Sequence, residues 1–508
     1  MKTTLGFLLI LLCIVMLTAG RRFNRSGKKQ SLFCSHDADC DSDQLCRRMF
    51  RDCEIPKKCF PATNIGNTCT RNSDCWDTDP MFPCDGTRCR CQDGVCTCGE
   101  CFTEVDQRCE PTQSQAGRTG TSFHTGYMFS LSTSSGSQYL YILSPCANVN
   151  ITVPFLSILD EPHEVINSKV IEFPPTLQVK SDGVPSNKTV YIKSDSQVTV
   201  YWLNSKTNSA DGGRILSDEE LGQEYILASD RSGNTRPDRF EQFLIVSLQN
   251  GTSVQIEYSD GSQETISLEA MEAFRKKGTE FSGTIVTSNE LIAVKSGHEC
   301  FVADGGRCDL MSEQIPPVSS LGCIHIIGYM KPFLTSYVRI AIPFDHTDVT
   351  IFDEDGNVVD CLVGMSRGDT FVKSYSNVAL SVISTERVLV IQYGDDYEED
   401  PVRDSSMMQI LSIDRYVSTY DFYVPENFEQ AILEIIIEST LDPTGLLLDG
   451  MMLSVTETVS ATVPGYGTYD IIYSNVSPGS HTLTHADVAV YTAFVYARRV
   501  RAEYAIVL

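Results

Sequence analysis

Short segments rich in Val, Ile, Tyr and Thr recur at regular intervals along the second part of the chain. Three of them align without gaps and begin at Ser194, Ser288 and Ser384, so their starts are 94 and 96 residues apart. A second landmark precedes each of them in the same order, at residues 139–143, 243–246 and 337–342. Apolar and polar residues alternate within these segments, which is the pattern of half-buried β-strands. The sequence therefore predicts tandem β-domains with a repeat of ~95 residues.

Each repeat is long enough to form a small domain. A fourth, more divergent copy begins at Ile432 and ends near Tyr496, and the turn sequences 258–262 and 353–357 supply hairpins. Several short strands in each repeat favour a sandwich of two antiparallel sheets. We therefore expect an all-β fold of four antiparallel β-sandwich-like repeats, near residues 122–210, 220–300, 325–400 and 415–500. A closed assembly of the four units is the alternative, and the one helical element expected is a turn or two between residues 268 and 277.

The first residues have the pattern of a secretory signal peptide. Lys2 is followed by an apolar run at residues 5–17 and by small residues at 18–20. That run is shorter than the ~20 residues needed to span a bilayer, so residues 1–20 are predicted to direct secretion and not to anchor the chain. A basic arm follows at 21–33, and no later segment has the pattern of a membrane span. We expect a secreted, extracellular protein.

Cysteines crowd between residues 34 and 109. This pattern is typical of a disulfide framework in a secreted chain, and the related segments 34–40 and 69–75 predict two similar knots that resemble small Cys-rich modules of the EB and dickkopf type. The polar stretch 110–121 is the predicted linker to the β-rich region, 122–508. The disulfide candidates of the module are Cys34, Cys40, Cys46, Cys53, Cys59, Cys69, Cys75, Cys84, Cys89, Cys91, Cys96, Cys98, Cys101 and Cys109.

The β-rich region holds few cysteines. Cys300 and Cys308 flank a short loop that contains two glycines, which predicts a local disulfide, although the nearby His298 and Asp309 also suggest a zinc site or a Cys/His nucleophile. The cysteines that follow the signal peptide are odd in number. One thiol therefore either stays buried and unpaired or is available for a bond to a second chain, giving a covalent oligomer.

Net charge limits the partners. The formal net charge is −26, which argues against nucleic acid and acidic glycans because both require a basic face. The glycosylation candidates are the sequons at Asn24, Asn150, Asn187, Asn250 and Asn475.

Two acidic segments are candidates for calcium binding. Asp353, Asp355 and Asn357 alternate as in a calcium loop, but the later Glu of that motif is missing, so a hairpin turn fits better. The run 395–400 concentrates five carboxylates, and a solvated charged loop fits it better. We expect no cofactor or bound metal. Because the sequence contains no nucleophile elbow, zinc-protease helix or phosphate-binding loop, we also expect no catalytic residues.

Residues 296–318 carry a distinctive motif. Its members are Gly297, His298, Cys300, Cys308, Asp309, Glu313, Gln314, Pro316 and Pro317. The motif closely resembles the amino-terminal domain of the IgG Fc-binding protein family, and the resemblance spans roughly residues 119–508. It implies kinship with large secreted glycoproteins of mucus and other secretions. Leu310 stands where the family usually has His, and the family's Gly-Asp-Pro-His self-cleavage motif is absent, so antibody binding and mucin-like cross-linking are not carried over.

These patterns favour a secreted recognition or adhesion protein of mucus, matrix or surface defence that binds extracellular proteins, mucins or glycans and is not an enzyme. Repeated units suit that role because they raise avidity without a single deep site. In the alternative reading, the Cys-rich module is the active part, as a protease inhibitor or a receptor ligand, and the β-rich region is its carrier.

Overall fold

The chain divides into two compact units, Met1–Glu110 and Pro111–Leu508. The computed structural model describes residues 44–47, 58–61, 68–69, 89–92, 95–98, 102–105, 108–111, 118–132, 135–229, 239–301, 308–331, 335–376, 378–395, 405–428, 430–487, 489–499 and 502–508. The predicted signal peptide 1–20, the basic arm 21–33 and the acidic residues 396–400 lie outside these ranges. Within them, no helix is both long enough and apolar enough to cross a membrane.

The described part of the first unit consists of short antiparallel hairpins. β1 (Gln44–Arg47) pairs with β2 (Lys58–Pro61), β3 (Cys89–Gln92) with β4 (Val95–Cys98), and β5 (Phe102–Val105) with β6 (Arg108–Pro111). In the register of these hairpins, Cys46 lies opposite Cys59 and Cys91 lies opposite Cys96. A lone two-stranded hairpin is marginally stable in water, so each of these hairpins needs support from outside its own two strands.

The second unit is built from four all-β repeats, whose described residues form five antiparallel sheets. Repeat 1 contains β7 (Gly120–Gly126), β8 (Gly136–Val153), β9 (Ile158–Phe173), β10 (Thr189–Lys206) and β11 (Ser209–Arg214). Repeat 2 contains β12 (Gly222–Ile226), β13 (Glu241–Ser247), β14 (Thr252–Glu257), β15 (Gln263–Leu268), β16 (Ala273–Gly278), β17 (Ile285–Phe301) and β18 (Asp309–Ile315). Repeat 3 contains β19 (Gly322–Ile327), β20 (Thr335–Ala341), β21 (Thr347–Phe352), β22 (Val358–Met365), β23 (Thr370–Tyr375), β24 (Leu380–Asp395) and β25 (Ser406–Gln409). Repeat 4 contains β26 (Thr419–Val424), β27 (Gln430–Glu438), β28 (Leu446–Leu448), β29 (Met451–Met452), β30 (Val455–Val463), β31 (Gly467–Val476), β32 (Gly479–His485), β33 (Thr492–Arg499) and β34 (Ala502–Val507).

All four repeats share one strand arrangement, which confirms the predicted tandem of antiparallel β-repeats. In repeats 1 to 3 a long strand (β10, β17 or β24) pairs through its first half with the first strand of the repeat and through its second half with the last strand. In repeat 4 the same path is divided into β32 and β33, which pair with β26 and β34. A strand that passes from one sheet half to the other lets the two halves face each other across a core.

The helical turn expected between residues 268 and 277 is not formed. Residues 273–278 are strand β16, in which Arg275 lies opposite Leu244 of β13, and Met271 has a positive φ of 63° in the turn before it. Pairing with β13 therefore decides the conformation here, because strand preference depends more on neighbouring strands than on local sequence.

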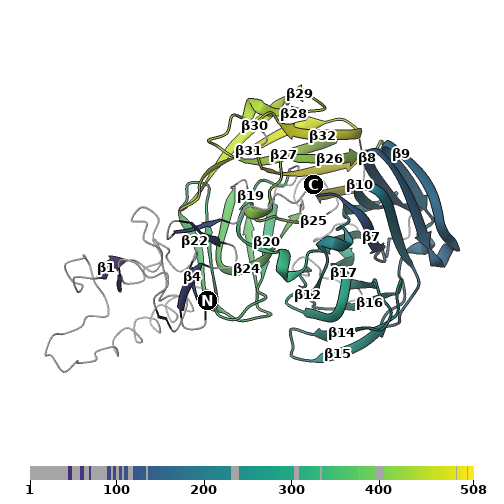
Figure 1. Cartoon of the computed structure of the whole chain (residues 1–508), viewed down its shortest axis with the longest axis horizontal. Coiled ribbons are helices and arrows are strands. Elements are labelled where there is room, and N and C mark those ends of the chain that lie inside the picture. The colour runs from purple at the N-terminus through teal and green to yellow at the C-terminus, as the bar shows by residue number, and fades with distance from the viewer. Residues whose placement is uncertain are drawn as a thin grey trace, which may run out of the picture. The chain divides into compact units, whose positions relative to one another are not determined.

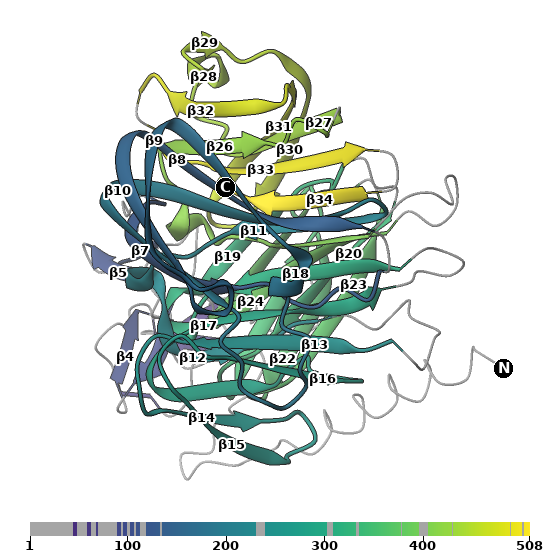
Figure 2. The same cartoon turned by 90° about the vertical axis from the view of Figure 1, so that its right-hand side faces the viewer.

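The four repeats close into a ring (Figure 1). Their last strands lie at its centre, where β11 contacts both β18 and β34, and β25 contacts the same two strands. Figure 2 shows the yellow C-terminal strand β34 beside the blue strands of repeat 1, and β34 contacts β11. The closed assembly, which the sequence left as an alternative, is therefore the arrangement that these sandwich-like repeats adopt.

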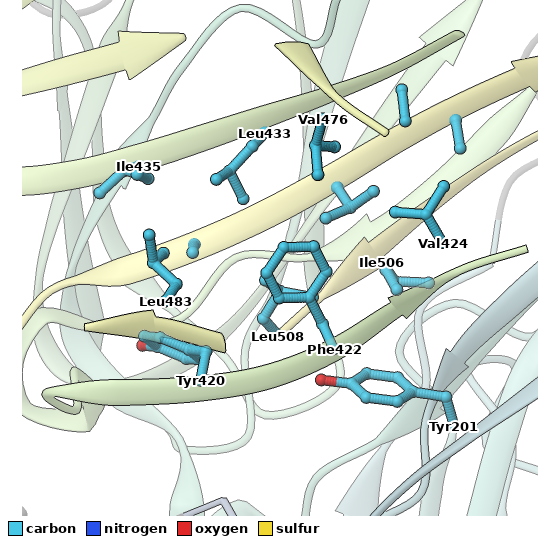
Figure 3. Packing of buried hydrophobic residues seen from close by; sticks show 14 of the residues in the cluster. Tyr201, Tyr420, Phe422, Val424, Leu433, Ile435, Val476, Leu483, Ile506 and Leu508 are labelled. Carbon is cyan, nitrogen blue, oxygen red and sulfur yellow. The ribbon is translucent and has the colours of Figure 1, made fainter. Parts of the chain in front are cut away.

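Apolar cores continue from one repeat into the next. One buried cluster joins Tyr201 of repeat 1 to Phe422 of repeat 4 (Figure 3). A second joins Met128 of repeat 1 to Leu244 of repeat 2, and a third combines side chains of β13 with those of β24. Fully burying a large apolar side chain is worth about 1.5–3 kcal/mol, so these shared clusters hold the repeats together.

Each short connector between repeats packs tightly against the first strand of the repeat that it leaves. The 3-10 turns η5 (Asp218–Glu220), η6 (Val318–Ser320) and η7 (Ile413–Arg415) link successive repeats. A Cβ added at Gly120, Gly222 or Gly322, the first residue of β7, β12 or β19, would overlap the residue that precedes η5, η6 or η7. The equivalent position in repeat 4 is Val417, which is bridged to Tyr491. Glycine is thus required where a connector passes.

Gly120→Ala is expected to destabilise the ring by about 1–3 kcal/mol, because the added methyl group meets the side chain of Ser217. Ser217→Gly by itself should cost a few tenths of a kcal/mol as a loss of an N-cap. The double variant should be more stable than Gly120→Ala alone, and thermal unfolding followed by circular dichroism would measure all three. Strictly additive effects would show that the close approach does not matter.

Candidate functional site at the centre of the ring

The motif of residues 297–317 lies at the centre of the ring. His298 and Cys300 are near the end of β17, and Asp309, Glu313 and Gln314 lie on β18. These five residues are exposed by 2% or less, and Gly297, Pro316 and Pro317 are buried as well. A macromolecular ligand cannot reach side chains that are covered in this way. The motif therefore holds the inner strands in place.

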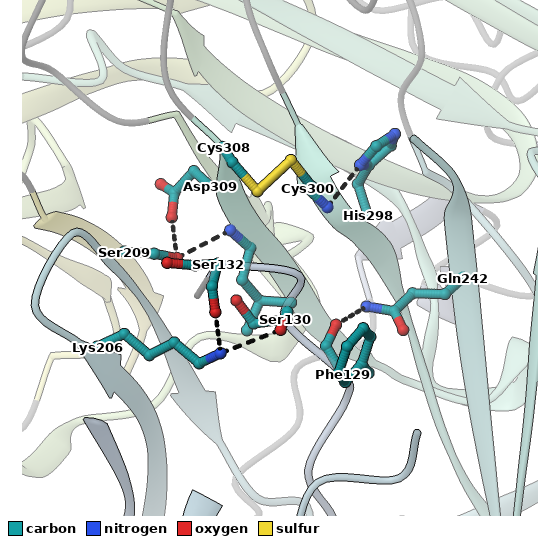
Figure 4. Close-up of a disulfide and its surroundings, with 11 residues drawn as sticks. Phe129, Ser130, Ser132, Lys206, Ser209, Gln242, His298, Cys300, Cys308 and Asp309 are labelled. Atoms are coloured by element: carbon teal, nitrogen blue, oxygen red, sulfur yellow. Dashed lines mark hydrogen bonds between the residues drawn. A yellow bond between two sulfur atoms is a disulfide. The ribbon is translucent and has the colours of Figure 1, made fainter. Parts of the chain in front are cut away.

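Cys300 and Cys308 form a disulfide that closes the connection between β17 and β18 (Figure 4). Their Cα atoms are 4.7 Å apart, and the Cys300 N–H donates a 3.0 Å hydrogen bond to Nδ1 of His298. A sulfur atom in a disulfide supplies neither a thiolate ligand nor a nucleophile. The zinc and Cys/His alternatives for this pair are therefore excluded.

Side chains join β11 to β18 where no strand ladder does. Ser209 Oγ donates to Asp309 Oδ1 (2.6 Å) and accepts the N–H of Leu310 (3.1 Å), as Figure 4 shows in part. Farther along, Oδ2 of Asp211 accepts the N–H of Ser312. A typical intramolecular hydrogen bond contributes about 0.5–1.5 kcal/mol, so these three contacts together fix the first repeat to the second.

A group of ionisable side chains is buried beside these contacts. Nζ of Lys295 lies 3.7 Å from the centroid of the Trp202 ring, which is a favourable cation–π distance. Burial raises the pKa of Glu313 to about 8, raises the pKa of Asp211 well above its ordinary value and lowers the pKa of Lys295. Loss of hydration thus favours the neutral forms of all three groups.

A partly buried ion pair lies at the end of repeat 1. Arg214 donates two hydrogen bonds to the carboxylate of Glu220, at 2.6 and 3.0 Å. Arg214 also donates to the carbonyl oxygen of Arg118 (3.4 Å), and Nη2 of Arg118 donates to the carbonyl oxygen of Arg415 (2.8 Å). The segment before β7 is therefore tied to the connector that leads into repeat 4.

Repeats 4 and 1 meet along what we call the 4–1 seam, where β33 and β26 lie against β10. Arg499 donates to Ser205 Oγ (2.9 Å) and to the carbonyl oxygen of Lys206 (2.6 Å). The Tyr201 hydroxyl donates to the carbonyl oxygen of Asp421 (3.0 Å). These polar contacts surround the apolar cluster of Figure 3 and complete the ring.

Another buried acid lies between repeats 3 and 4. Glu434 of β27 accepts a 2.9 Å hydrogen bond from the Tyr496 hydroxyl, and a Cβ added at Gly328 would overlap the Glu434 carboxylate. Burial raises the pKa of Glu434 to about 8. Several seams of the ring therefore enclose an acid that is protonated near neutral pH.

The segment 353–357, which resembles a calcium loop, forms the hairpin turn that its sequence favours. Oδ1 of Asp353 accepts the N–H groups of Asp355 (3.1 Å) and Asn357 (2.8 Å), so this oxygen is already used by the turn. Across the described ranges, no group of three or more His, Cys, Asp or Glu side chains is placed to hold a metal ion.

The remaining cysteines divide into four groups. Cys34, Cys40, Cys53, Cys75, Cys84 and Cys101 lie outside the described residues, and Cys46, Cys59, Cys89, Cys91 and Cys109 lie on the module's strands. Cys69, Cys96, Cys98, Cys323 and Cys361 are disulfide-bonded. Among the described residues, the free cysteine is Cys146, which is exposed at a bulge of β8. The buried-thiol alternative therefore does not apply to it.

The sequons differ in accessibility. Asn187, Asn250 and Asn475 are exposed, whereas Asn150 is half-buried in β8 between β9 and β10. Asn24 lies outside the described residues.

Sequence reasoning missed Asp211, Trp202 and Lys295. Lys295 directly follows the apolar residues 291–294 within one strand, and a charge in such a run was the signal that pointed to a buried ionisable group. Neither Asp211 nor Trp202 has a comparable local signal, because each gains its partner from another repeat.

Replacing Cys300 and Cys308 together by Ser should destabilise the ring by about 2.5 kcal/mol, the loop-closure term for so short a loop. Cys146→Ser is the matched control and should leave the melting temperature unchanged, since the Cys146 thiol is exposed and unbonded. Thermal melts of the three proteins would test this, and equal melting temperatures would contradict a stabilising role for the disulfide.

Glu434→Gln should increase stability relative to the wild type as pH rises from 5 to 8. Between the ordinary Glu pKa of 4.5 and the folded value of about 8, the unfolded chain releases a proton that the native chain retains, so wild-type stability falls with pH. Gln has no such proton. Glu164→Gln, at an exposed site on β9, is the control. Melting temperatures at pH 5 and 8 that move in parallel in all three proteins would refute the expectation.

Comparison with known proteins places the fold in a family. The family model described as IgGFc binding protein matches residues 211–497. Human IgGFc-binding protein is 26% identical over 167 residues, which cover 30% of this chain and 3% of the human protein. The chain thus corresponds to a small part of that relative.

Solved structures give a much weaker likeness. A biofilm-associated protein BSP domain is 8% identical with a TM-score of 0.13, covering 80% of this chain and 99% of that one. A tetra-tandem repeat of a large adhesion protein is 12% identical with a TM-score of 0.09, covering 78% and 97%. These scores are too low to indicate a shared fold. The family match, in contrast, extends over more than half of the 508 residues and includes β18, and it confirms the predicted kinship: the chain belongs to the IgGFc-binding protein family.

Proposed function

We propose that this chain is a secreted extracellular binding protein that recognises protein or glycan ligands by its outer surfaces and carries out no catalysis. The observation that carries the proposal is the burial of the motif residues at the centre of the ring. The motif residues that mark the chain as a family member build its scaffold. Ligand choice is therefore determined by the outward-facing strands and loops.

The repeated architecture supports the same proposal. Four similar units in one rigid ring present related surfaces at fixed spacings, and several weak contacts made together give strong overall binding. The formal net charge of −26 disfavours acidic ligands. Neutral glycans and proteins with basic or neutral surfaces fit better.

The full-length secreted chain should be captured selectively from solution by at least one immobilised extracellular ligand. A panel of neutral and sialylated glycans, mucins, matrix proteins and immunoglobulin G, measured by biolayer interferometry, would test this. Unfolded chain made by reduction and heating is the control, because ring-dependent binding must disappear with the fold. Absence of selective capture across the panel would overturn the proposal.

Secretion and surface glycosylation give a second test. In animal cells the chain should reach the medium with its N-terminus near residue 21 and carry N-glycans at Asn187, Asn250 and Asn475. Removing each sequon by Asn→Gln should increase gel mobility stepwise, whereas Asn150→Gln should not, because that side chain is half-buried between two strands. Retention of the chain in the cell, or a shift for Asn150→Gln alone, would contradict the expectation.

A further inference from the structure

Three tyrosines form a row along the rim of the 4–1 seam. Tyr139 and Tyr141 lie two residues apart on β8, with ring centroids 6.2 Å apart and planes 25° apart. Tyr141 stacks on Tyr423 of β26 with a centroid distance of 4.7 Å and an angle of 21°. Tyr141 is buried, whereas Tyr139 and Tyr423 are half-exposed. We call these three residues the tyrosine row.

Exposed polar groups flank the two half-exposed rings. Glu172 of β9 lies directly opposite Tyr139, so the two side chains share one face of the sheet, and Glu172 is exposed. Glu426 is exposed and hydrogen-bonds to Tyr423. The row thus combines aromatic surface with hydrogen-bond acceptors.

From this arrangement we propose that the tyrosine row is a binding site for neutral oligosaccharides. The C–H faces of a sugar ring are weakly positive, and they suit the negative faces of tyrosine rings. The hydroxyl groups of the sugar donate hydrogen bonds, and the two exposed carboxylates are acceptors for them. The proposal rests on the proposed function and names the ligand class for one of its surfaces.

Charge selects among glycans at this site. Two carboxylates flank the row and the whole chain carries a formal net charge of −26, so a sialylated or sulfated glycan meets repulsion both locally and at long range. A neutral oligosaccharide that ends in galactose meets no such repulsion. Weak single-site affinity fits a ligand that is displayed in many copies.

A second tyrosine pair on the ring has one ring face covered by a lysine. Tyr329 and Tyr473 lie between repeats 3 and 4 with centroids 6.3 Å apart, but Nζ of Lys331 lies 4.5 Å from the centroid of the Tyr473 ring and occupies its face. Tyr329 is half-exposed. Tyr329→Ala therefore removes another half-exposed tyrosine at a seam without touching the proposed site, and it is the matched control.

The test measures binding of the full-length chain to three surfaces: albumin carrying a neutral, galactose-terminated oligosaccharide, the same conjugate capped with sialic acid, and bare albumin. The wild type should bind the neutral conjugate at least tenfold more tightly than the other two, and the free oligosaccharide should compete. Tyr139→Ala and Tyr423→Ala should each weaken that binding about tenfold, the loss of one aromatic contact.

Controls separate a lost site from a lost fold. Tyr423→Phe keeps the ring face and should retain binding to the neutral conjugate, and Tyr329→Ala should bind as the wild type does. Melting temperatures of all variants identify any that fail to fold. Unchanged binding of folded Tyr139→Ala would overturn the tyrosine row as the site.

The outcome also distinguishes this inference from the broader proposal. If the protein binds none of the three surfaces but captures another extracellular ligand, the oligosaccharide site alone is overturned. A chain that captures nothing overturns the binding function as well.

Discussion

The ring depends on contacts between its inner strands, which are made by side chains and not by a continuous sheet. Ser209 and Asp211 of β11 reach Asp309, Leu310 and Ser312 of β18. Without these bonds, the carboxylates and amide groups at the centre would be buried without partners, which costs about 1–3 kcal/mol for each group. Repeats 1 and 2 need each other in order to satisfy these groups, so folding of either one is coupled to their assembly in the ring.

This constraint explains why polar residues occupy so much of the ring's centre. Apolar contacts are not directional, so an apolar centre would allow the repeats many relative positions. Hydrogen bonds to carboxylates are directional, and they form in one relative position of the repeats. Lys295 and Glu313 are ionisable groups whose charged forms are disfavoured by burial. The raised pKa of Glu313 reflects that cost. In this protein the polar centre specifies how the repeats are arranged, and the apolar clusters between repeats supply the stability.

Sequence reasoning reached the all-β repeats because each strand carries its own alternating pattern. It reached the Cys300–Cys308 disulfide because only a short glycine-containing loop separates the two residues. It could not choose ring closure over an open tandem, because that choice depends on pairs such as Ser209 with Asp309, 100 residues apart, and Tyr201 with Asp421, 220 residues apart. For the same reason the tyrosine row was not predicted: Tyr141 and Tyr423 belong to different repeats, and neither strand indicates the other. The expected helical turn near residue 270 failed for a related cause, since strand pairing with β13 overrides the local sequence.

The glycines beneath the connectors also make one position answer to two repeats. Gly120, Gly222 and Gly322 each leave room for the connector that leads into the next repeat, whereas the equivalent position in repeat 4 is the buried Val417. A larger residue at one of the three glycines would displace that connector, and with it the point at which the next repeat begins. The side chains that each position tolerates are therefore set by a segment at the far end of the same repeat, and a substitution there changes two units at once.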